Sequence, residues 1–494
     1  MFTLVIQGTF ENAIHLLKHA SFYIEVFEIR LDLIEDISLE KLSILRHLTP
    51  KKILFTLRTK KHGGHYEGSF KDYCDYIFSI LPLHPDYIDI EIEATQQLLD
   101  KIKTLYPSVK IVLSSHHFDK ATGLSQAFSN LLSFQADVYK LAISGDVLEA
   151  LKMLLLTKKT VEKGIAFTGI VMGKEGVLSR LLSKIVGNYF IFCSATPNFL
   201  GQLTIEEMVN IYHIHKTSKE TKVFGLIGNP VTASPSHITH NRLFENLGLD
   251  AIYVKIFLEE NQLSSFLMYA KALFDGLSIT APFKEKILEF VNIMSSEAKN
   301  IGAINTLKKK SVSWVGENTD RLGAYKALSN FCALKNKNCL VVGCGGAAKA
   351  IIYELLQHSA EVTVLNRSEK KQKLSMKQYT FNDIFPQLRD KKFDILIQAT
   401  SCELHGDDLP ESILDFLEDK PLVFETIITP KYTNFLNKSL QKGCFVIEGY
   451  HMFLHQAAYQ FKFWFELDED ESILYEKLKS IYLSFACEEV SVKS

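Results

Sequence analysis

The chain has 494 residues, 47% hydrophobic and 23% charged, with a formal net charge of -2 at pH 7. This length suits two or three domains, and the small net charge argues against nucleic acid or a membrane surface as the main partner, since no positive field would attract either. No apolar run reaches the roughly 18 residues that cross a bilayer. Because no signal-like N-terminus is present and the eight cysteines form no C-x-x-C pair, we expect a cytoplasmic protein with reduced thiols and no metal.

The first 215 residues alternate between short β-branched or aromatic runs and segments with apolar residues at i, i+3 and i+4. The eight runs lie at 2–7, 23–29, 53–57, 87–92, 110–115, 137–142, 165–171 and 189–194. This alternation predicts an α/β fold with a closed parallel (β/α)8 TIM barrel over residues 1–215. An open doubly wound sheet is the alternative. The polar stretch 215–222 predicts a linker.

Polar side chains occur in or just after the expected barrel strands, whose C-terminal ends carry catalytic residues in this architecture. They are Glu28, Arg30, Arg58, His116, Lys140, Arg180 and Ser194. A lone histidine or arginine at such a place is usually structural or solvated. Seven such polar residues at the same end of one barrel indicate an active site.

Lys140 interrupts an apolar strand in A-D-V-Y-K-L-A (136–142). Burial and nearby arginines would disfavour its charged form, and a neutral amine attacks a ketone to give an iminium that acidifies the adjacent C–H. His116 could then move the proton, and arginines pair with carboxylates. The residues predict Schiff-base elimination or aldol cleavage of an anionic keto acid.

Five motifs in this half are similar to those of type I 3-dehydroquinate dehydratase: F-E-I-R-L-D (27–32), T-L-R-T (56–59), L-S-S-H-H-F (113–118), A-D-V-Y-K-L-A and G-V-L-S-R-L (176–181). The resemblance implies Lys140 as the Schiff-base lysine and His116 as the general acid/base, with Glu28 in the catalytic set. It implies substrate contacts from Arg30, Arg58, Arg180, Ser194 and Gln202.

The chain departs from that family at two places. K-K-H-G-G puts His62 where the family usually has glutamate, so His116 should experience a different field. The loop S-A-T-P-N-F-L-G-Q (194–202) is longer than the family's S-A-P-G-Q, which leaves several hydroxyl candidates beside Ser194.

In the second half, V-V-G-C-G-G-A-A-K-A (341–350) follows an apolar strand and opens a helix, as a phosphate-binding glycine turn does. The next strand, 361–365, ends in Asn366 and Arg367 rather than in an acidic residue. This favours NADP(H) over NAD(H) in a Rossmann-like domain. The expected cofactor contacts are Gly343, Gly345, Gly346, Ala347, Asn366 and Arg367.

Three segments upstream supply a lysine, an asparagine and an aspartate: G-L-S-I-T-A-P-F-K-E-K (276–286) with Lys284, G-A-I-N-T-L (302–307) with Asn305, and G-E-N-T-D-R-L-G (316–323) with Asp320. Alone, Lys284 would be interpreted as a solvated charge in the first turn of a helix. Beside a nicotinamide, such a group could protonate a carbonyl as hydride arrives.

With G-N-P-V-T-A-S-P-S-H (228–237), these motifs resemble shikimate dehydrogenase over residues 223 to about 480. The resemblance implies Lys284 and Asp320 as the catalytic pair. It also implies substrate contacts from Ser234, Ser236, Thr280, Asn305 and Gln456, and places Gly449 and Met452 near the nicotinamide. Ser278, Glu317 and Ile428 depart from common family residues.

The resulting domain prediction is a barrel at 1–215, a substrate-binding domain at 223–322 completed by helices at 449–485, and an NADP domain at 323–448. The two resemblances imply consecutive steps of the shikimate pathway, from 3-dehydroquinate to 3-dehydroshikimate and then shikimate, with small-molecule partners only. Alternatives are another class I Schiff-base lyase, a quinate-type dehydrogenase, or a non-catalytic metabolite-binding regulator. The oligomeric state stays open.

Overall fold

The computed structural model describes residues 1–118, 123–197, 201–368, 377–381, 387–388 and 390–493, with backbone only at 405 and 486–493. The chain forms two compact units: Met1–Lys222 with Asp250–Val254 and Met268–Leu273, and the remainder from Val223 to the C-terminus. Within the described residues, no helix combines the length and apolar character needed to cross a membrane.

The first unit contains eight parallel strands in the order β7-β6-β5-β4-β3-β2-β1-β8. They are β1 (Phe2–Gly8), β2 (Val26–Ile34), β3 (Lys52–Thr56), β4 (Tyr87–Glu91), β5 (Lys110–His117), β6 (Val138–Ser144), β7 (Phe167–Met172) and β8 (Ile191–Cys193). All eight predicted strands are present, and the barrel prediction is confirmed over the open sheet.

The ring of strands is completed between β7 and β8 by a side chain. The Asn188 amide donates to the carbonyl of Gly169 and accepts from its N–H, both at 3.1 Å. Tyr189 N–H donates to Phe167 O at 2.8 Å. A side-chain amide thus takes the place of a peptide group where the β7–β8 ladder would run.

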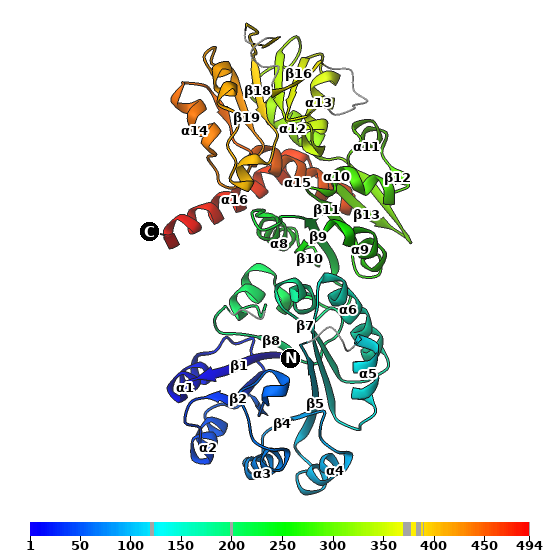
Figure 1. Ribbon diagram of the computed structural model, residues 1–494, viewed down its shortest axis with the longest axis vertical. Helices are drawn as coiled ribbons and strands as arrows, with labels where there is room; N and C mark the ends of the chain where they lie inside the picture. The colour runs from blue at the N-terminus through cyan, green and yellow to red at the C-terminus, as the bar shows by residue number, and fades with distance from the viewer. Residues whose placement is uncertain (119–122, 198–200, 369–376, 382–386, 389, 494) are drawn as a thin grey trace. The chain divides into compact units, whose positions relative to one another are not determined.

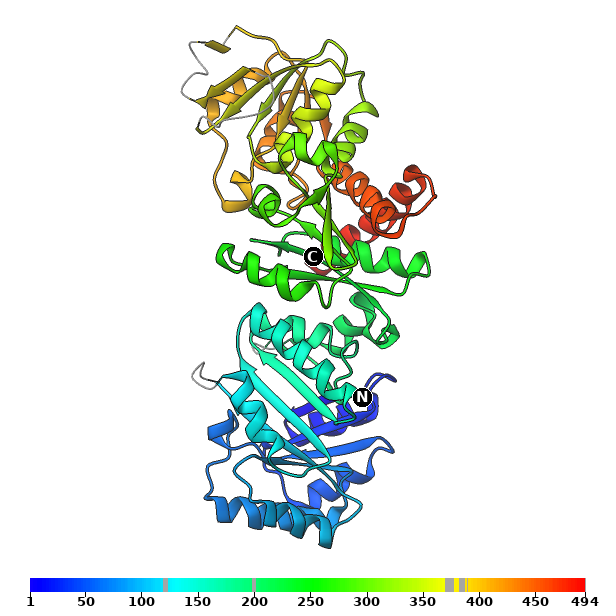
Figure 2. The ribbon, with the colours of Figure 1, turned by 90° about the vertical axis from the view of Figure 1, so that its right-hand side faces the viewer.

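Helices surround these strands (Figures 1 and 2). They are α1 (Phe10–His19), α2 (Leu39–His47), α3 (Phe70–Ile80), α4 (Gln96–Leu105), α5 (Leu124–Leu132), α6 (Val147–Glu162) and α7 (Val177–Leu181). Thr9, Ser38, Ser69, Thr95 and Asp146 each accept a backbone N–H at a helix start. Such caps satisfy donors that have no partner inside the helix, and they fix where the helices begin.

The barrel interior is layered because alternate residues of a strand share a face. One apolar layer contains Val26, Leu54, Tyr87, Val112 and Val138. Two residues further along the same strands lie Glu28, Thr56, Asp89, Ser114 and Lys140, all buried. The apolar layer therefore closes the interior below a polar layer at the C-terminal ends of the strands.

The second half contains two further sheets. The first has the order β10-β9-β11-β13-β14-β12. Its strands are β9 (Lys222–Gly228), β10 (Ala251–Phe257), β11 (Gly276–Ile279), β12 (Ile293–Met294), β13 (Thr306–Lys310) and β14 (Ser313–Glu317). Its helices are α8 (Ser236–Asn246), α9 (Leu263–Ala270), α10 (Phe283–Lys286) and α11 (Ser296–Ile301).

The other sheet is parallel, with the order β17-β16-β15-β18-β19-β20. Its strands are β15 (Asn338–Val342), β16 (Glu361–Asn366), β17 (Lys377–Thr380), β18 (Ile395–Gln398), β19 (Leu422–Glu425) and β20 (Val446–Ile447). One face packs against α12 (Asp320–Ser329) and α13 (Gly346–Gln357), the other against α14 (Asn434–Gln441) (Figure 1). This is the predicted Rossmann-like order, which reverses beside the β15–α13 turn.

The chain then returns to the preceding sheet through α15 (Tyr450–Phe465), which is followed by α16 (Glu471–Lys493). Gln460 of α15 donates to Thr306 Oγ1 at 2.8 Å, and Trp464 Nε1 donates to Leu307 O at 2.9 Å. These bonds fasten α15 to β13.

Candidate active sites

Lys140 lies in the polar layer of the barrel. Its Nζ is 3.1 Å from Oε1 of Glu28, 3.5 Å from Oδ2 of Asp89 and 4.2 Å from the centre of the Phe192 ring. Arg58 donates to the same Asp89 oxygen at 2.7 Å, so an arginine does lie near Lys140, and the two cations share that carboxylate. The direct contacts of Lys140 are two carboxylates and an aromatic ring.

Arg58 is buried and bound by side chains of two strands. It donates to Asp89 and Ser114 at 2.7 Å and to Glu91 at 3.3 Å. Burial acts to lower the pKa of Arg58, but the charges of Asp89 and Glu91 outweigh it and hold that pKa above its usual value. Arg58 thus links the ends of β3, β4 and β5 through its side-chain hydrogen bonds.

Asp89 and Glu91 were missed by the sequence analysis. Burial acts to raise the pKa of Asp89, while Arg58, Lys140 and Ser114 hold it below the usual value. Both carboxylates sit in Y-I-D-I-E-I (87–92). Acidic residues at a spacing of two in an otherwise apolar strand were the signal, because that spacing puts both on the interior face.

His116 follows these residues on β5, half-buried, with its Nδ1 shielded from water and without a hydrogen-bond partner in the described structure. Burial, then the charges of Arg58 and Lys140, hold its pKa well below the usual histidine value. His116 is therefore neutral in the free protein. A neutral imidazole is the form that accepts a proton.

The remaining predicted barrel residues are dispersed around this centre. Arg30 makes a two-pronged pair with Asp32, at 2.9 and 2.8 Å. Arg180 is buried, its Nε has no partner among the described atoms, and burial lowers its pKa to about 10. Ser194 is buried, and its N–H donates to the carbonyl of Leu203 at 3.0 Å. Gln202, the residue before Leu203 in the chain, is half-buried.

The second unit brings the predicted lysine and aspartate together. Nζ of Lys284 lies 2.6 Å from Oδ2 of Asp320. Asn305 donates to the other Asp320 oxygen at 2.9 Å and to Gln456 at 3.2 Å. Three residues from α10, α12 and α15, together with Asn305 just before β13, thus form one hydrogen-bonded group.

Of the expected carboxylate-binding serines, Ser234 lies in the turn before α8 and Ser236 is the first residue of that helix. Ser234 Oγ donates to Ser236 Oγ at 3.0 Å. Thr280 follows β11, and its N–H donates to Ile227 at 3.0 Å. The departures are absorbed locally: Ser278 donates to Gln460 at 3.3 Å, and Glu317 accepts from Ser295 and from Asn318 N–H at 2.8 Å.

The glycine turn touches Lys284. A Cβ on Gly346, the first residue of α13, would lie 2.6 Å from Cβ of Lys284. Gly343 has φ +113°, and a Cβ there would lie 2.7 Å from the Ala399 carbonyl oxygen. The turn therefore needs both glycines, and it leaves the N-terminal amides of α13 available to an anion.

The other expected cofactor residues border this turn. Gly345 is the N-cap of α13, followed by Gly346 and half-buried Ala347. Asn366 ends β16, where its side chain donates to Ser368 O at 2.7 Å, and Arg367 is exposed. Gly449 precedes α15, which carries buried Met452.

Comparison with known proteins covers both halves. Family models match for type I 3-dehydroquinase at residues 1–219, for the shikimate dehydrogenase substrate binding domain at 226–307, and for a putative NAD(P)-binding domain at 331–411. The chain is 37% identical over 252 residues to the shikimate dehydrogenase (NADP(+)) of Pyrococcus furiosus, covering 50% of this chain and 90% of that protein.

Two relatives span both halves. The bifunctional 3-dehydroquinate dehydratase/shikimate dehydrogenase, chloroplastic, of Arabidopsis thaliana is 30% identical over 470 residues, covering 89% of this chain and 77% of that protein. Shikimate biosynthesis protein AroDE of Chlamydia pneumoniae is 30% identical over 447 residues, covering 90% of each. The chain belongs to the family of bifunctional 3-dehydroquinate dehydratases/shikimate dehydrogenases of the shikimate pathway.

Proposed function

We propose that the barrel dehydrates 3-dehydroquinate through a Schiff base on Lys140, and that the second unit reduces the 3-dehydroshikimate formed to shikimate with NADPH. The observation that carries the first step is the placement of Lys140 against two buried carboxylates, in the layer next to a neutral His116. The proposed domains are 1–215, 223–322 with 449–485, and 323–448.

In the dehydration, the Lys140 amine attacks the ketone carbon, and loss of water leaves an iminium. Glu28 accepts a hydrogen bond from Nζ and takes up the proton that the amine sheds. His116 then removes a proton from the carbon next to the iminium. The resulting enamine expels the β-hydroxyl group, which leaves as water with the proton from His116, and hydrolysis frees the lysine.

Arg180 would hold the substrate carboxylate. Its guanidinium is buried with an unpaired Nε, so the free protein bears the cost of desolvating a charge without a partner. A carboxylate would supply the missing acceptor in two-pronged geometry. Arg30, Arg58, Ser194 and Gln202 would complete the substrate contacts around it.

In the reduction, bound NADPH supplies the hydride. Lys284 donates the proton to the carbonyl oxygen, and Asp320 holds that ammonium in place. Ser234 and Ser236 would bind the carboxylate, and Thr280, Asn305 and Gln456 the hydroxyls. The proton donors and acceptors of both reactions are side chains, so neither step calls for a metal.

NADP(H) fits the glycine turn because Gly343 and Gly346 let the chain turn tightly against Ala399 and Lys284, and a Cβ on Gly345, the N-cap of α13, would meet no atom within 4 Å, which leaves room for a phosphate at the helix N-terminus. The proposed pyrophosphate contacts are Gly343, Gly345, Gly346 and Ala347. Asn366 and Arg367 would bind the 2′-phosphate, which favours NADP(H) over NAD(H). Gly449 and Met452 would border the nicotinamide.

A coupled assay tests both sites. The purified protein, given 3-dehydroquinate and NADPH, should oxidise NADPH and accumulate shikimate. Unchanged NADPH absorbance with 3-dehydroquinate, and again with added 3-dehydroshikimate, would contradict the proposal. Borohydride with 3-dehydroquinate should attach the substrate carbon skeleton to Lys140, and an adduct that persists in Lys140→Ala would rule out this lysine.

A further inference from the structure

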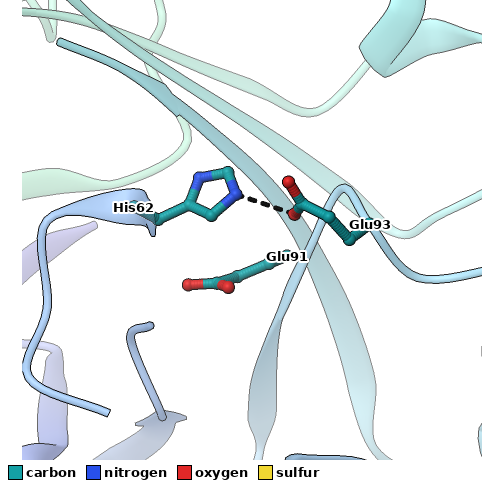
Figure 3. Close-up of side chains that lie close together, drawn as sticks. All are labelled: His62, Glu91 and Glu93. Atoms are coloured by element: carbon teal, nitrogen blue, oxygen red, sulfur yellow. Dashed lines mark hydrogen bonds and ion pairs between the residues drawn. The ribbon is translucent and has the colours of Figure 1, made fainter. Parts of the chain in front are cut away.

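A second histidine lies beside His116. His62 belongs to the short helix Lys60–His62 after β3, and its side chain is buried. The two imidazole rings meet edge to face, with centres 5.9 Å apart. His62 Nε2 lies 2.7 Å from Oε2 of Glu93, as Figure 3 shows.

The hydrogen bonds of His62 define its tautomer. Its Nδ1 is 3.2 Å from the backbone nitrogen of His116, which can only donate. Nδ1 is therefore the acceptor, and the ring proton resides on Nε2, which donates to Glu93. The negative end of the imidazole dipole thus points toward His116, and Glu93 maintains that orientation.

Glu93 is an anion in this arrangement. Burial acts to raise its pKa, but hydrogen bonds from His62 and Lys61 lower that pKa to about 2. Glu91 lies below His62 in the view of Figure 3, and it accepts from Arg58, Thr59 N–H and Thr59 Oγ1. Since each oxygen of Glu91 and Glu93 already has a donor, we interpret the group as two neighbouring sets of hydrogen bonds rather than as a cation site.

His116 needs a nearby negative charge when it takes up a proton. Burial lowers its pKa most, followed by the charges of Arg58 from the end of β3, Lys140 from β6 and Arg30 from β2; His62 would lower it only when protonated, whereas the tautomer assigned above is neutral. Arg58 and Arg30 are paired with Asp89, Glu91 and Asp32, and Lys140 with Glu28 and Asp89. Glu93 is the carboxylate whose hydrogen bonds lead to His116, through a single side chain.

We propose that Glu93 is a positioning residue for the dehydratase, which acts through His62 to orient His116 and to stabilise the proton that His116 receives. The proposal rests on the general-base role of His116 proposed above. It also requires the tautomer assigned above. In the reversed tautomer the Nδ1–H of His62 would face the backbone N–H of His116, and Nε2 would have no proton to donate to Glu93.

The test compares Glu93→Gln with Glu67→Gln, a carboxylate of the same loop that pairs with Lys60 in solvent. Dehydration is followed by product absorbance across pH. Loss of the Glu93 charge should lower kcat about tenfold, the equivalent of one pKa unit, with little change in KM. The acid limb of the kcat profile should move to lower pH, because the base is weakened. Glu67→Gln should match the unmodified protein.

His62→Gln provides the conservative rescue. A glutamine can accept from His116 N–H and donate to Glu93, so it should retain most of the activity, whereas His62→Leu should not. Borohydride adduct formation on Lys140 should persist in every variant, which reports an intact barrel. Glu93→Asp serves as a second variant, with a smaller loss.

Two outcomes would overturn the inference: an unchanged kcat and pH profile in Glu93→Gln, or a lower kcat with an unmoved acid limb, as a merely structural role would give. The dehydration rate of His116→Ala tests the general-base role of His116 separately. If that variant dehydrates 3-dehydroquinate at the full rate, His116 is not the base, whatever Glu93 does.

Discussion

Nζ of Lys140 and Oε1 of Glu28 lie 3.1 Å apart, although 112 residues separate them in the chain. Thr56 donates to the same Glu28 oxygen at 3.0 Å. The carboxylate is therefore held in one orientation against the amine that would become the Schiff base.

Glu28→Gln should slow formation of the covalent adduct on Lys140, because the amide takes up no proton from the amine. We expect a loss of about a hundredfold, within the range of general acid–base catalysis. Borohydride trapping with time-resolved mass spectrometry measures it. The control is Glu25→Gln, just before β2, where the carboxylate is 55% exposed. An unchanged trapping rate in Glu28→Gln would show that another group receives the proton.

Arg180→Met should weaken substrate binding and stabilise the free protein. Loss of a charge-assisted pair with the substrate carboxylate should raise KM for dehydration by roughly tenfold to a hundredfold. Removal of a buried, unpaired charge should raise the free energy of unfolding by about 1 kcal/mol. Kinetics and urea unfolding of the same variant test both effects. A raised KM with reduced stability would contradict the desolvation argument.

Gly346→Ala should damage the dehydrogenase and spare the dehydratase. The new Cβ would lie 2.6 Å from Cβ of Lys284, so the lysine must shift away from Asp320. We expect a loss of about 1–3 kcal/mol in stability, as for an overpacked core, and a lower kcat for shikimate oxidation. Gly345→Ala meets no atom within 4 Å and should leave the stability unchanged. Equal stability of the two variants would refute the contact.

Glu425 at the end of β19 predicts a pH dependence of stability. Its burial raises its pKa to about 8, despite hydrogen bonds from Ile427 N–H and Thr433. The folded-state pKa exceeds the unfolded value of about 4.3, so the stabilisation is complete below the unfolded pKa and is lost as pH rises to about 8. The Tm of the unmodified protein minus that of Glu425→Gln should therefore decrease as the pH is raised from about 4.3 to about 8. A difference that is constant with pH would contradict the assignment.

Much of the barrel follows from periodicity. Alternation along each strand predicts the eight strands, and it places Glu28 and Lys140 on the interior face two residues beyond Val26 and Val138. The glycine turn was also predicted from the sequence. The structure gives the reason for two of its glycines, because Gly343 and Gly346 meet backbone or side-chain atoms at distances that only glycine allows.

The sequence did not predict which polar side chains pair with one another inside the barrel. Arg58 lies opposite Asp89 because tilted strands bring side chains of successive layers together, and single-strand periodicity carries no information on that offset. The same limit concealed the bond between His62 and Glu93, which are 31 residues apart on loops after different strands.

Asn188 gives barrel closure an unusual chemical basis. The Gly169 N–H and C=O are satisfied by one side-chain amide, so hydrogen exchange at Gly169 should report the rotamer of Asn188 as well as opening of the strands. Conversion of that amide to a carboxylate would set two acceptors against each other at the Gly169 carbonyl. Since Asn188, Arg180 and Phe192 line one small cavity, a change of the Asn188 side chain would alter the closure of the ring and the surroundings of the arginine proposed to bind substrate at the same time.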